Sequence, residues 1–117
     1  MDIKTLAAIQ REFDKTHGWL PTPGDAPSIL DFLRSDVVGL CGEVGEVAGI
    51  VKTLGLESTQ GDVQVELKKR MPDLHEELID VLIYLVRIID YLEVDVESVY
   101  MDKLKKNEVR FAKYEQK

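Results

Sequence analysis

The sequence predicts an all-α protein, a compact bundle of about four to five helices, on three observations. Apolar residues recur at helical spacings, prolines and glycines gather between the apolar runs, and no segment requires a strand. The chain has 117 residues, the usual size of one domain, and contains neither an internal repeat nor a low-complexity linker. Residues 1–117 are therefore expected to form a single domain with one core and one site.

The first half of the chain is predicted to contain two helices. The first covers residues 2–16, where apolar side chains follow a helical spacing, and Gly18 ends it. A loop with three prolines leads to the second helix, predicted over residues 28–54. Ser28 and Asp31 resemble a capping box at the start of this helix.

The second half is predicted to contain two longer helices and one uncertain segment between them. Residues 55–61 look like a break because a glycine lies at each end, and residues 62–70 would form a short polar helix or an ordered flap. Pro72 suits the first turn of a helix that continues to residue 92. Asp95 can cap a last helix that extends to residue 114.

The composition is that of a globular protein, with 44% apolar and 32% charged residues. Asp and Glu outnumber Lys and Arg by 22 to 15, so the surface repels polyphosphate and nucleic acid is not an expected partner. The single cysteine, Cys41, forms no intramolecular disulfide, and the first residues do not resemble a signal peptide, which predicts a cytoplasmic protein. No membrane partner is expected, because the apolar stretch 78–92 contains charged residues and is too short to cross a bilayer.

Four carboxylates form two pairs with the same spacing. Glu43 and Glu46 are three residues apart in the second predicted helix, and Glu77 and Asp80 repeat that spacing in a later one. Residues three apart lie on one face of a helix. If the two helices pack face to face, the four carboxylates converge, and their repulsion requires neutralisation by protons or cations.

The residue types in this cluster predict Mg²⁺, with Mn²⁺ as a substitute, because ligand sets made only of oxygen suit these ions. Neither His17 nor His75 has the position that a di-iron bundle requires, and zinc would lack nitrogen and sulfur ligands. A solvated helix face is the alternative for any one such pair. Asp80 weakens this alternative, because apolar residues flank it and an unpaired carboxylate among them is costly.

Glycines are unusually frequent in the helix that carries the first pair. Gly39, Gly42, Gly45 and Gly49 each cost roughly 1 kcal/mol relative to alanine in a helix interior. Close approach of a neighbouring helix would compensate for this cost, and close approach of a ligand to the backbone is the alternative. Tight helix packing is the interpretation that we favour from the sequence.

The chain resembles the MazG-like family of all-α nucleoside triphosphate pyrophosphohydrolases through three segments in order. These are Gly42-Glu43-Val44-Gly45-Glu46, Glu77-Leu78-Ile79-Asp80-Val81-Leu82-Ile83-Tyr84 and Lys103-Leu104-Lys105-Lys106-Asn107-Glu108-Val109-Arg110. The first two follow the family pattern of Glu-x-x-Glu and Glu-x-x-Asp, and the third is similar to its basic last helix. The resemblance implies that the four carboxylates bind Mg²⁺ and form the catalytic centre. There, water would attack the α-phosphorus of a nucleoside triphosphate and release pyrophosphate, for house-cleaning or control of the nucleotide pool.

Five other residues are candidate substrate contacts. Lys103, Asn107 and Arg110 share one face of the last helix and could hold phosphates, a solvated helix end being the alternative. Trp19 and His17 could stack on a nucleobase or hydrogen-bond to it, although a buried Trp19 that anchors its loop is the favoured interpretation. The basic run 68–70 could approach phosphate, but a solvated run of charges is favoured.

The helix that carries the second pair is apolar nearly all round and needs partners on every side. Homo-oligomerisation, as a homodimer or homotetramer, is therefore expected to complete the bundle. Two other functions stay open: a dUTP or phosphoribosyl-ATP pyrophosphohydrolase of the same superfamily, and a catalytically silent helical module that binds a regulatory partner. The four intact carboxylates argue against the silent module.

Overall fold

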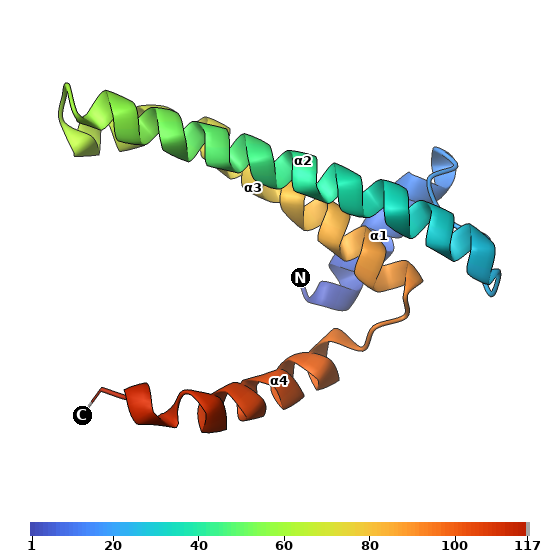
Figure 1. Ribbon diagram of the computed structural model, residues 1–117. Coiled ribbons are helices and arrows are strands. Elements are labelled where there is room, and N and C mark those ends of the chain that lie inside the picture. Colours follow the sequence, from blue (N-terminus) through green and yellow to red (C-terminus); the bar gives the residue numbers. More distant parts are fainter. Residues whose placement is uncertain (117) are drawn as a thin grey trace.

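The computed structural model describes residues 1–116, which form four α-helices and one short 3-10 helix and contain no strand (Figure 1). In chain order the elements are α1 (Ile3–Thr16), α2 (Ala26–Ser58), α3 (Val63–Tyr91), α4 (Val96–Arg110) and the 3-10 helix η1 (Ala112–Tyr114). The all-α prediction is confirmed. Within the described residues, no helix has both the length and the apolar character needed to cross a membrane.

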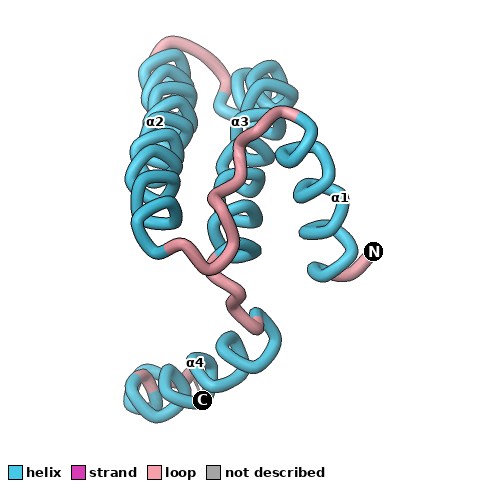
Figure 2. Tube along the Cα trace, turned by 90° about the vertical axis from the view of Figure 1, so that its right-hand side faces the viewer, coloured by secondary structure: helices cyan, strands magenta, loops and turns pink. Residues whose placement is uncertain are grey.

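The two longest helices, α2 and α3, form an antiparallel hairpin at the centre of the fold. They contain 33 and 29 residues, and the short turn 59–62 joins them. They lie side by side in both views (Figures 1 and 2). An aspartate caps the start of each, because Asp25 Oδ1 accepts the N–H of Ser28 at 3.2 Å and Asp62 Oδ1 accepts the N–H of Gln64 at 2.8 Å.

Helix α1 packs on α3 on the side away from α2 (Figure 2). The carboxylate of Asp2 caps α1 by accepting the N–H of Thr5 at 2.8 Å. Gly18 follows the end of α1 and has a φ of 71°. Residues other than glycine rarely adopt this backbone conformation. The start of this helix and its glycine stop therefore agree with the prediction. Helix α3 becomes the middle member of a three-helix unit.

The predicted boundaries of α2 are wrong at both ends. The helix begins at Ala26 behind the Asp25 cap, so Ser28 lies inside the first turn instead of capping it. It also continues through Gly55 to Ser58, so the break predicted over residues 55–61 is confined to the turn 59–62. One glycine costs about 1 kcal/mol in a helix, which is less than packing against a 29-residue neighbour contributes.

The predicted start of α3 is also wrong. Its first residue is Val63, so residues 62–70 are the Asp62 cap and the first two turns of α3 instead of a separate helix or flap. Pro72 lies inside the helix, where it removes the hydrogen bond to the carbonyl of Lys68. Both residues are exposed, so water can hydrogen-bond that carbonyl. The helix passes through the proline because its packing on α2 outweighs the lost bond.

The chain by itself is not compact, which corrects the expectation of a compact bundle. Its radius of gyration is 18.3 Å and its extents are 53 × 42 × 27 Å, whereas a compact domain of 100 residues has a radius near about 13 Å. Apart from Pro21, Val86 is the only buried apolar residue within residues 1–116. Helix α4 causes the open shape, because it leaves the end of α3 and runs apart from the other helices (Figures 1 and 2).

The expected tight packing at glycine is present only at Gly39, because nothing lies within 4 Å of a Cβ built at Gly42, Gly45 or Gly49. A Cβ built there would lie 2.6 Å from the ring of Tyr84 on α3. We predict that Gly39→Ala destabilises the protein by about 1–3 kcal/mol, because the ring must move away from its contacts. Gly55→Ala is the control: nothing lies within 4 Å of its Cβ, so it should stabilise by up to about 1 kcal/mol. Urea denaturation measures both changes, and equal behaviour of the two variants would contradict the packing role of Gly39.

Candidate functional site

Three of the four predicted metal ligands converge between α2 and α3. Glu43, Glu77 and Asp80 each offer one carboxylate oxygen, and these oxygens lie within 4.8 Å of one another. All three side chains are half-buried. Glu77 and Asp80 share a face of α3 because they are three residues apart, and the antiparallel pairing of the hairpin brings Glu43 of α2 opposite them. No other group of at least three potential metal ligands exists among residues 1–116.

Glu46, the fourth predicted ligand, lies at the edge of this group. It is exposed on α2, one turn after Glu43, and its carboxyl group helps to raise the pKa of Glu77. The structure therefore brings three of the four carboxylates together, and the fourth, Glu46, acts on Glu77 from the neighbouring turn of α2. We name Glu43, Glu46, Glu77 and Asp80 the acidic cluster.

Glu77 has the most perturbed carboxyl group of the acidic cluster. Burial raises its pKa to about 7, and the carboxyl group of Glu46 and the charges of Asp80 and Glu43 act in the same direction. Its Oε2 atom is buried and has no hydrogen-bond partner. A buried acceptor without a partner costs free energy, and a cation would relieve both that cost and the repulsion. An all-oxygen donor set of this kind fits Mg²⁺ or Mn²⁺.

We predict that the metal-free protein loses stability as the pH rises through about 7. The folded-state pKa of Glu77 lies above the ordinary value of 4.5, so its contribution is fully present below pH 4.5 and is lost as the pH passes about 7. Thermal midpoints in chelator at about pH 5.5 and about pH 8 measure this loss, and Glu77→Gln should show a smaller difference. The same difference in both proteins would contradict the assignment to Glu77.

A second polar network, centred on Arg87, was not predicted from the sequence. Arg87 donates two hydrogen bonds to Asp14 of α1, each at 2.9 Å, and one to Asp36 of α2 at 3.3 Å. Tyr91 donates to the other oxygen of Asp36 at 3.0 Å. Burial disfavours the charge of Arg87, but the two carboxylates outweigh it and raise its pKa. This arrangement joins α1, α2 and α3 through one guanidinium group.

Trp19 lies beside the Arg87 network and is not buried, so the favoured interpretation of an anchoring core residue is wrong. Its side chain is 44% exposed and stacks on the ring of His17, with ring centroids 4.6 Å apart. The guanidinium carbon of Arg87 lies 5.5 Å from the centre of its ring. Trp19 also lines a cavity of about 250 Å³. The other residues that line this cavity are Phe32, Ser35, Asp36, Tyr84 and Arg87.

The predicted phosphate contacts do not meet the acidic cluster within one chain. Lys103, Asn107 and Arg110 lie on α4, whose substantial packing within the described residues is limited to η1. In the basic run 68–70, Arg70 forms an ion pair with Glu57 of α2. That pair fastens the end of the hairpin, so Arg70 has a structural partner in place of phosphate.

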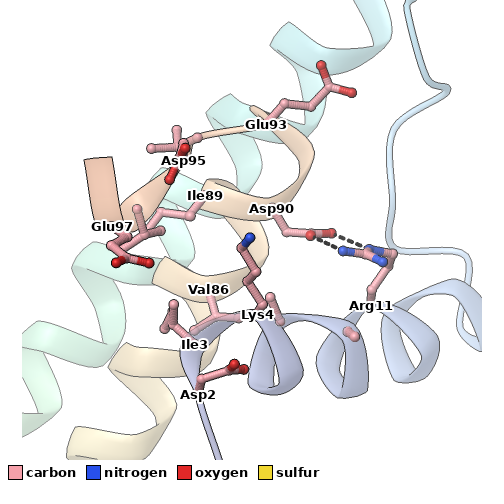
Figure 3. A pocket seen from close by; sticks show the side chains of 14 residues that line it. Asp2, Ile3, Lys4, Arg11, Val86, Ile89, Asp90, Glu93, Asp95 and Glu97 are labelled. Atoms are coloured by element: carbon pink, nitrogen blue, oxygen red, sulfur yellow. Dashed lines mark hydrogen bonds and ion pairs between the residues drawn. The ribbon is translucent and has the colours of Figure 1, made fainter. Parts of the chain in front are cut away.

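A second cavity, of about 780 Å³, lies between the first half of α1, the end of α3 and the start of α4 (Figure 3). Arg11 and Asp90 close one side of it with paired hydrogen bonds, the longer being 2.8 Å. Acidic side chains, Glu93, Asp95 and Glu97, lie around the turn into α4 (Figure 3). This cavity contains none of the predicted site residues, so the chemistry is expected at the acidic cluster instead.

Comparisons with protein-family models, with curated proteins and with solved structures find no match for this chain. The resemblance to the MazG-like family therefore depends on the two carboxylate motifs and the basic segment 103–110 alone. The activity, metal and substrate that this resemblance implies stay predictions.

Proposed function

We propose that this protein hydrolyses a nucleoside triphosphate to the monophosphate and pyrophosphate with the help of Mg²⁺. The observation that carries the proposal is the convergence of Glu43, Glu77 and Asp80, with oxygens within 4.8 Å of one another and one buried oxygen unpaired. Ordinary surface carboxylates point into water, where each is hydrated separately. Three of them held together on two packed helices favour a cation, and the cation in turn favours a polyanionic substrate.

Glu43, Glu77 and Asp80 would hold the metal, and Glu46 would support it from the edge of the acidic cluster. When bound, Mg²⁺ neutralises phosphate oxygens, which stabilises the charge that develops during hydrolysis. The chain itself contributes rigidity, because the ligands sit inside continuous helices instead of on loops. It also contributes a half-buried position in which electrostatic interactions are stronger than in water.

The cavity beside Trp19 is the best candidate for the nucleobase. It lies along α3 from the acidic cluster, since Tyr84 in its wall is one helical turn beyond Asp80. Its volume of about 250 Å³ is below the usual range of about 300–1,000 Å³ for a complete ligand site, so it suits one part of a nucleotide. The ring of Trp19 can stack on a base, and Ser35 offers a hydroxyl group for the edge of a base.

The direct test is a panel of natural and damaged nucleoside triphosphates, incubated with the protein and Mg²⁺ and separated by ion-exchange chromatography. Monophosphate and pyrophosphate in equal amounts would support the proposal, and the preferred base would separate a dUTP or phosphoribosyl-ATP specificity from a broader one. Diphosphate with orthophosphate would reject cleavage at the α-phosphorus. Absence of turnover with every nucleotide would favour the silent helical module.

Metal binding gives a prediction that does not require turnover. Mg²⁺ at about 100 times its dissociation constant should stabilise the protein by roughly 2.7 kcal/mol, because the ion binds only the folded chain. Differential scanning fluorimetry without nucleotide measures the rise in the thermal midpoint. Glu43→Gln is the matched control and should show a much smaller rise. An unchanged midpoint for the parent in millimolar Mg²⁺ would contradict a preformed metal site.

Homo-oligomerisation belongs to the same proposal. A chain of this length with so few buried apolar residues leaves most of its apolar surface in water. A second copy of the chain is the partner that is always present, and symmetric pairs are the commonest soluble assemblies. Light scattering coupled to size-exclusion chromatography tests this, with a dimer or tetramer expected.

A further inference from the structure

Arg87 is the one cationic side chain among the residues that line the cavity beside Trp19. Its exposed fraction is 8%. Its guanidinium carbon lies 5.5 Å from the ring centre of Trp19 and 5.1 Å from that of Tyr84, and both rings line the same cavity. A cation over aromatic rings is attracted to them, so the guanidinium group is a fixed part of the cavity wall.

This guanidinium group has more hydrogen-bond donors than its protein partners use. Arginine carries five N–H groups. Arg87 uses three of them, because Nε and Nη2 each donate to Asp14 and Nη1 donates to Asp36. The other two, one on Nη1 and one on Nη2, have no partner among residues 1–116. A buried donor without a partner costs free energy, so these N–H groups favour an acceptor that enters the cavity.

The two aspartates fix the orientation of Arg87. Asp14 accepts from Arg87 at both oxygens and also from Gln10 at 2.9 Å. Asp36 accepts from Arg87 at one oxygen and from Tyr91 at the other. Arg87 cannot rotate without breaking these bonds, so its free donors stay in one place. A ligand reaches them from the cavity that Arg87 lines.

A fixed pair of donors distinguishes nucleobases by their acceptors. Guanine, cytosine, thymine and uracil each carry at least one carbonyl oxygen, whereas adenine carries none and places an amino group beside its ring nitrogens. That amino group is itself a donor and would face the donors of Arg87. A site built to hydrogen-bond one group rejects an analogue that lacks it, because the buried polar groups of the site are left unpaired.

We propose that Arg87 determines which nucleobase is accepted, by donating hydrogen bonds to a carbonyl oxygen of the base in the cavity beside Trp19. The substrate then carries guanine, cytosine, thymine, uracil or the damaged base hypoxanthine, but not adenine. The inference rests on the proposed function, because the phosphates of the same nucleotide bind at the acidic cluster. It also separates two functions that the sequence left open, since dUTP has the required acceptor and phosphoribosyl-ATP is an adenine nucleotide.

A matched pair of ligands tests the inference on the parent protein. Hypoxanthine and adenine are purines that differ by a carbonyl in place of an amino group at position 6. Their α,β-imido triphosphates resist cleavage at the α-phosphorus, so binding in Mg²⁺ is measured without turnover. Trp19 is the single tryptophan of the chain and lines the cavity, and its fluorescence reports binding. The hypoxanthine analogue should bind at least about tenfold more tightly. Equal affinity of the two analogues, tight or weak, overturns the inference.

Arg87→Lys tests the donors directly. Lysine keeps a positive charge beside Asp14 and Asp36, but these carboxylates require its three N–H groups and none is left for a base. Affinity for the hypoxanthine analogue should fall at least about tenfold, and affinity for the adenine analogue should stay the same. Arg11→Lys is the matched control and should change neither affinity, because Arg11 is also paired with an aspartate, Asp90, but lies outside this cavity.

A purely structural role of Arg87 has a different outcome. Arg87→Lys would then weaken both analogues by the same factor, and this result overturns the inference. Circular dichroism shows whether the variant is folded. If it is not, the preference of the parent protein between hypoxanthine and adenine decides.

Hydrolysis of natural triphosphates distinguishes failure of the inference from failure of the proposed function. Cleavage of dATP as fast as dGTP leaves the proposed function standing and overturns the role of Arg87. Absence of all hydrolysis rejects the proposed function, whereas a preference for hypoxanthine that Arg87→Lys removes still assigns base recognition to Arg87. Absence of binding by both analogues overturns the inference together with the nucleotide site.

Discussion

Replacing Arg87 with methionine is expected to destabilise the protein by about 3–5 kcal/mol, more than any other single substitution that we predict. The exposed fractions of Asp14, Asp36 and Arg87 are 0%, 6% and 8%. Removing the guanidinium leaves two buried carboxylates without their main partner. Methionine keeps much of the side-chain volume, so the measured loss reports the charges more than a cavity.

Arg34→Met is the matched control for this prediction. Arg34 is also paired with an aspartate, Asp31, but at 3.9 Å and with both side chains exposed. Such pairs contribute little, and the change should stay within about 0.5 kcal/mol. Urea denaturation at one fixed chain concentration compares the variants, since association would otherwise shift the midpoints. A loss below about 1 kcal/mol for Arg87→Met would mean that the network does not hold the three helices together.

The Arg87 network could not be predicted because its contacts are distant in sequence. Arg87 is 73 positions from Asp14 and 51 from Asp36. Arg87 and Tyr91 are four residues apart and so lie on one face of α3, but spacing within one helix says nothing about which residues of other helices lie opposite. A single aspartate on α1 and another on α2 gave no signal by themselves, because most aspartates are solvated.

The acidic cluster was predictable for the opposite reason. A spacing of three residues fixes the relation of Glu77 to Asp80 within a helix, whatever the tertiary structure is. Only one further condition, antiparallel packing of two long helices, was needed to bring Glu43 opposite them. The predictions at Gly55 and Pro72 were wrong because glycine and proline disfavour a helix by only about 1–3 kcal/mol. The packing of the long α2–α3 hairpin outweighs that cost, and the helices continue through both residues.

Asp80→Asn is expected to abolish nucleotide hydrolysis while leaving the metal-free protein at least as stable as the parent. The stability part follows from charge. Without metal, one oxygen of Asp80 lies within 4.8 Å of oxygens of Glu43 and Glu77, so the three carboxylates repel one another. Asparagine removes one negative charge, keeps the size of the side chain and can donate a hydrogen bond to a neighbouring carboxylate.

The structure removes the main alternative for Asp80. An aspartate on an apolar helix can be satisfied by an internal cation, and Arg87, two turns further along α3, is the nearest candidate on the same helix face. Arg87 instead binds Asp14 and Asp36, and no ion pair of Asp80 occurs among the described residues. Asp80 therefore has no structural partner to lose, and the usual cost of breaking a buried pair does not apply.

Activity should move in the other direction, because asparagine retains one carbonyl oxygen but not the charge that attracts a divalent ion. A site maintained at a cost to the fold shows this opposition between function and stability. Denaturation in chelator and a pyrophosphate-release assay in Mg²⁺ measure the two properties. Asp73→Asn, on the exposed part of α3, controls for the loss of one charge and should change neither. Strong destabilisation of Asp80→Asn without metal, or hydrolysis at the parental rate, would remove Asp80 from the set of metal ligands.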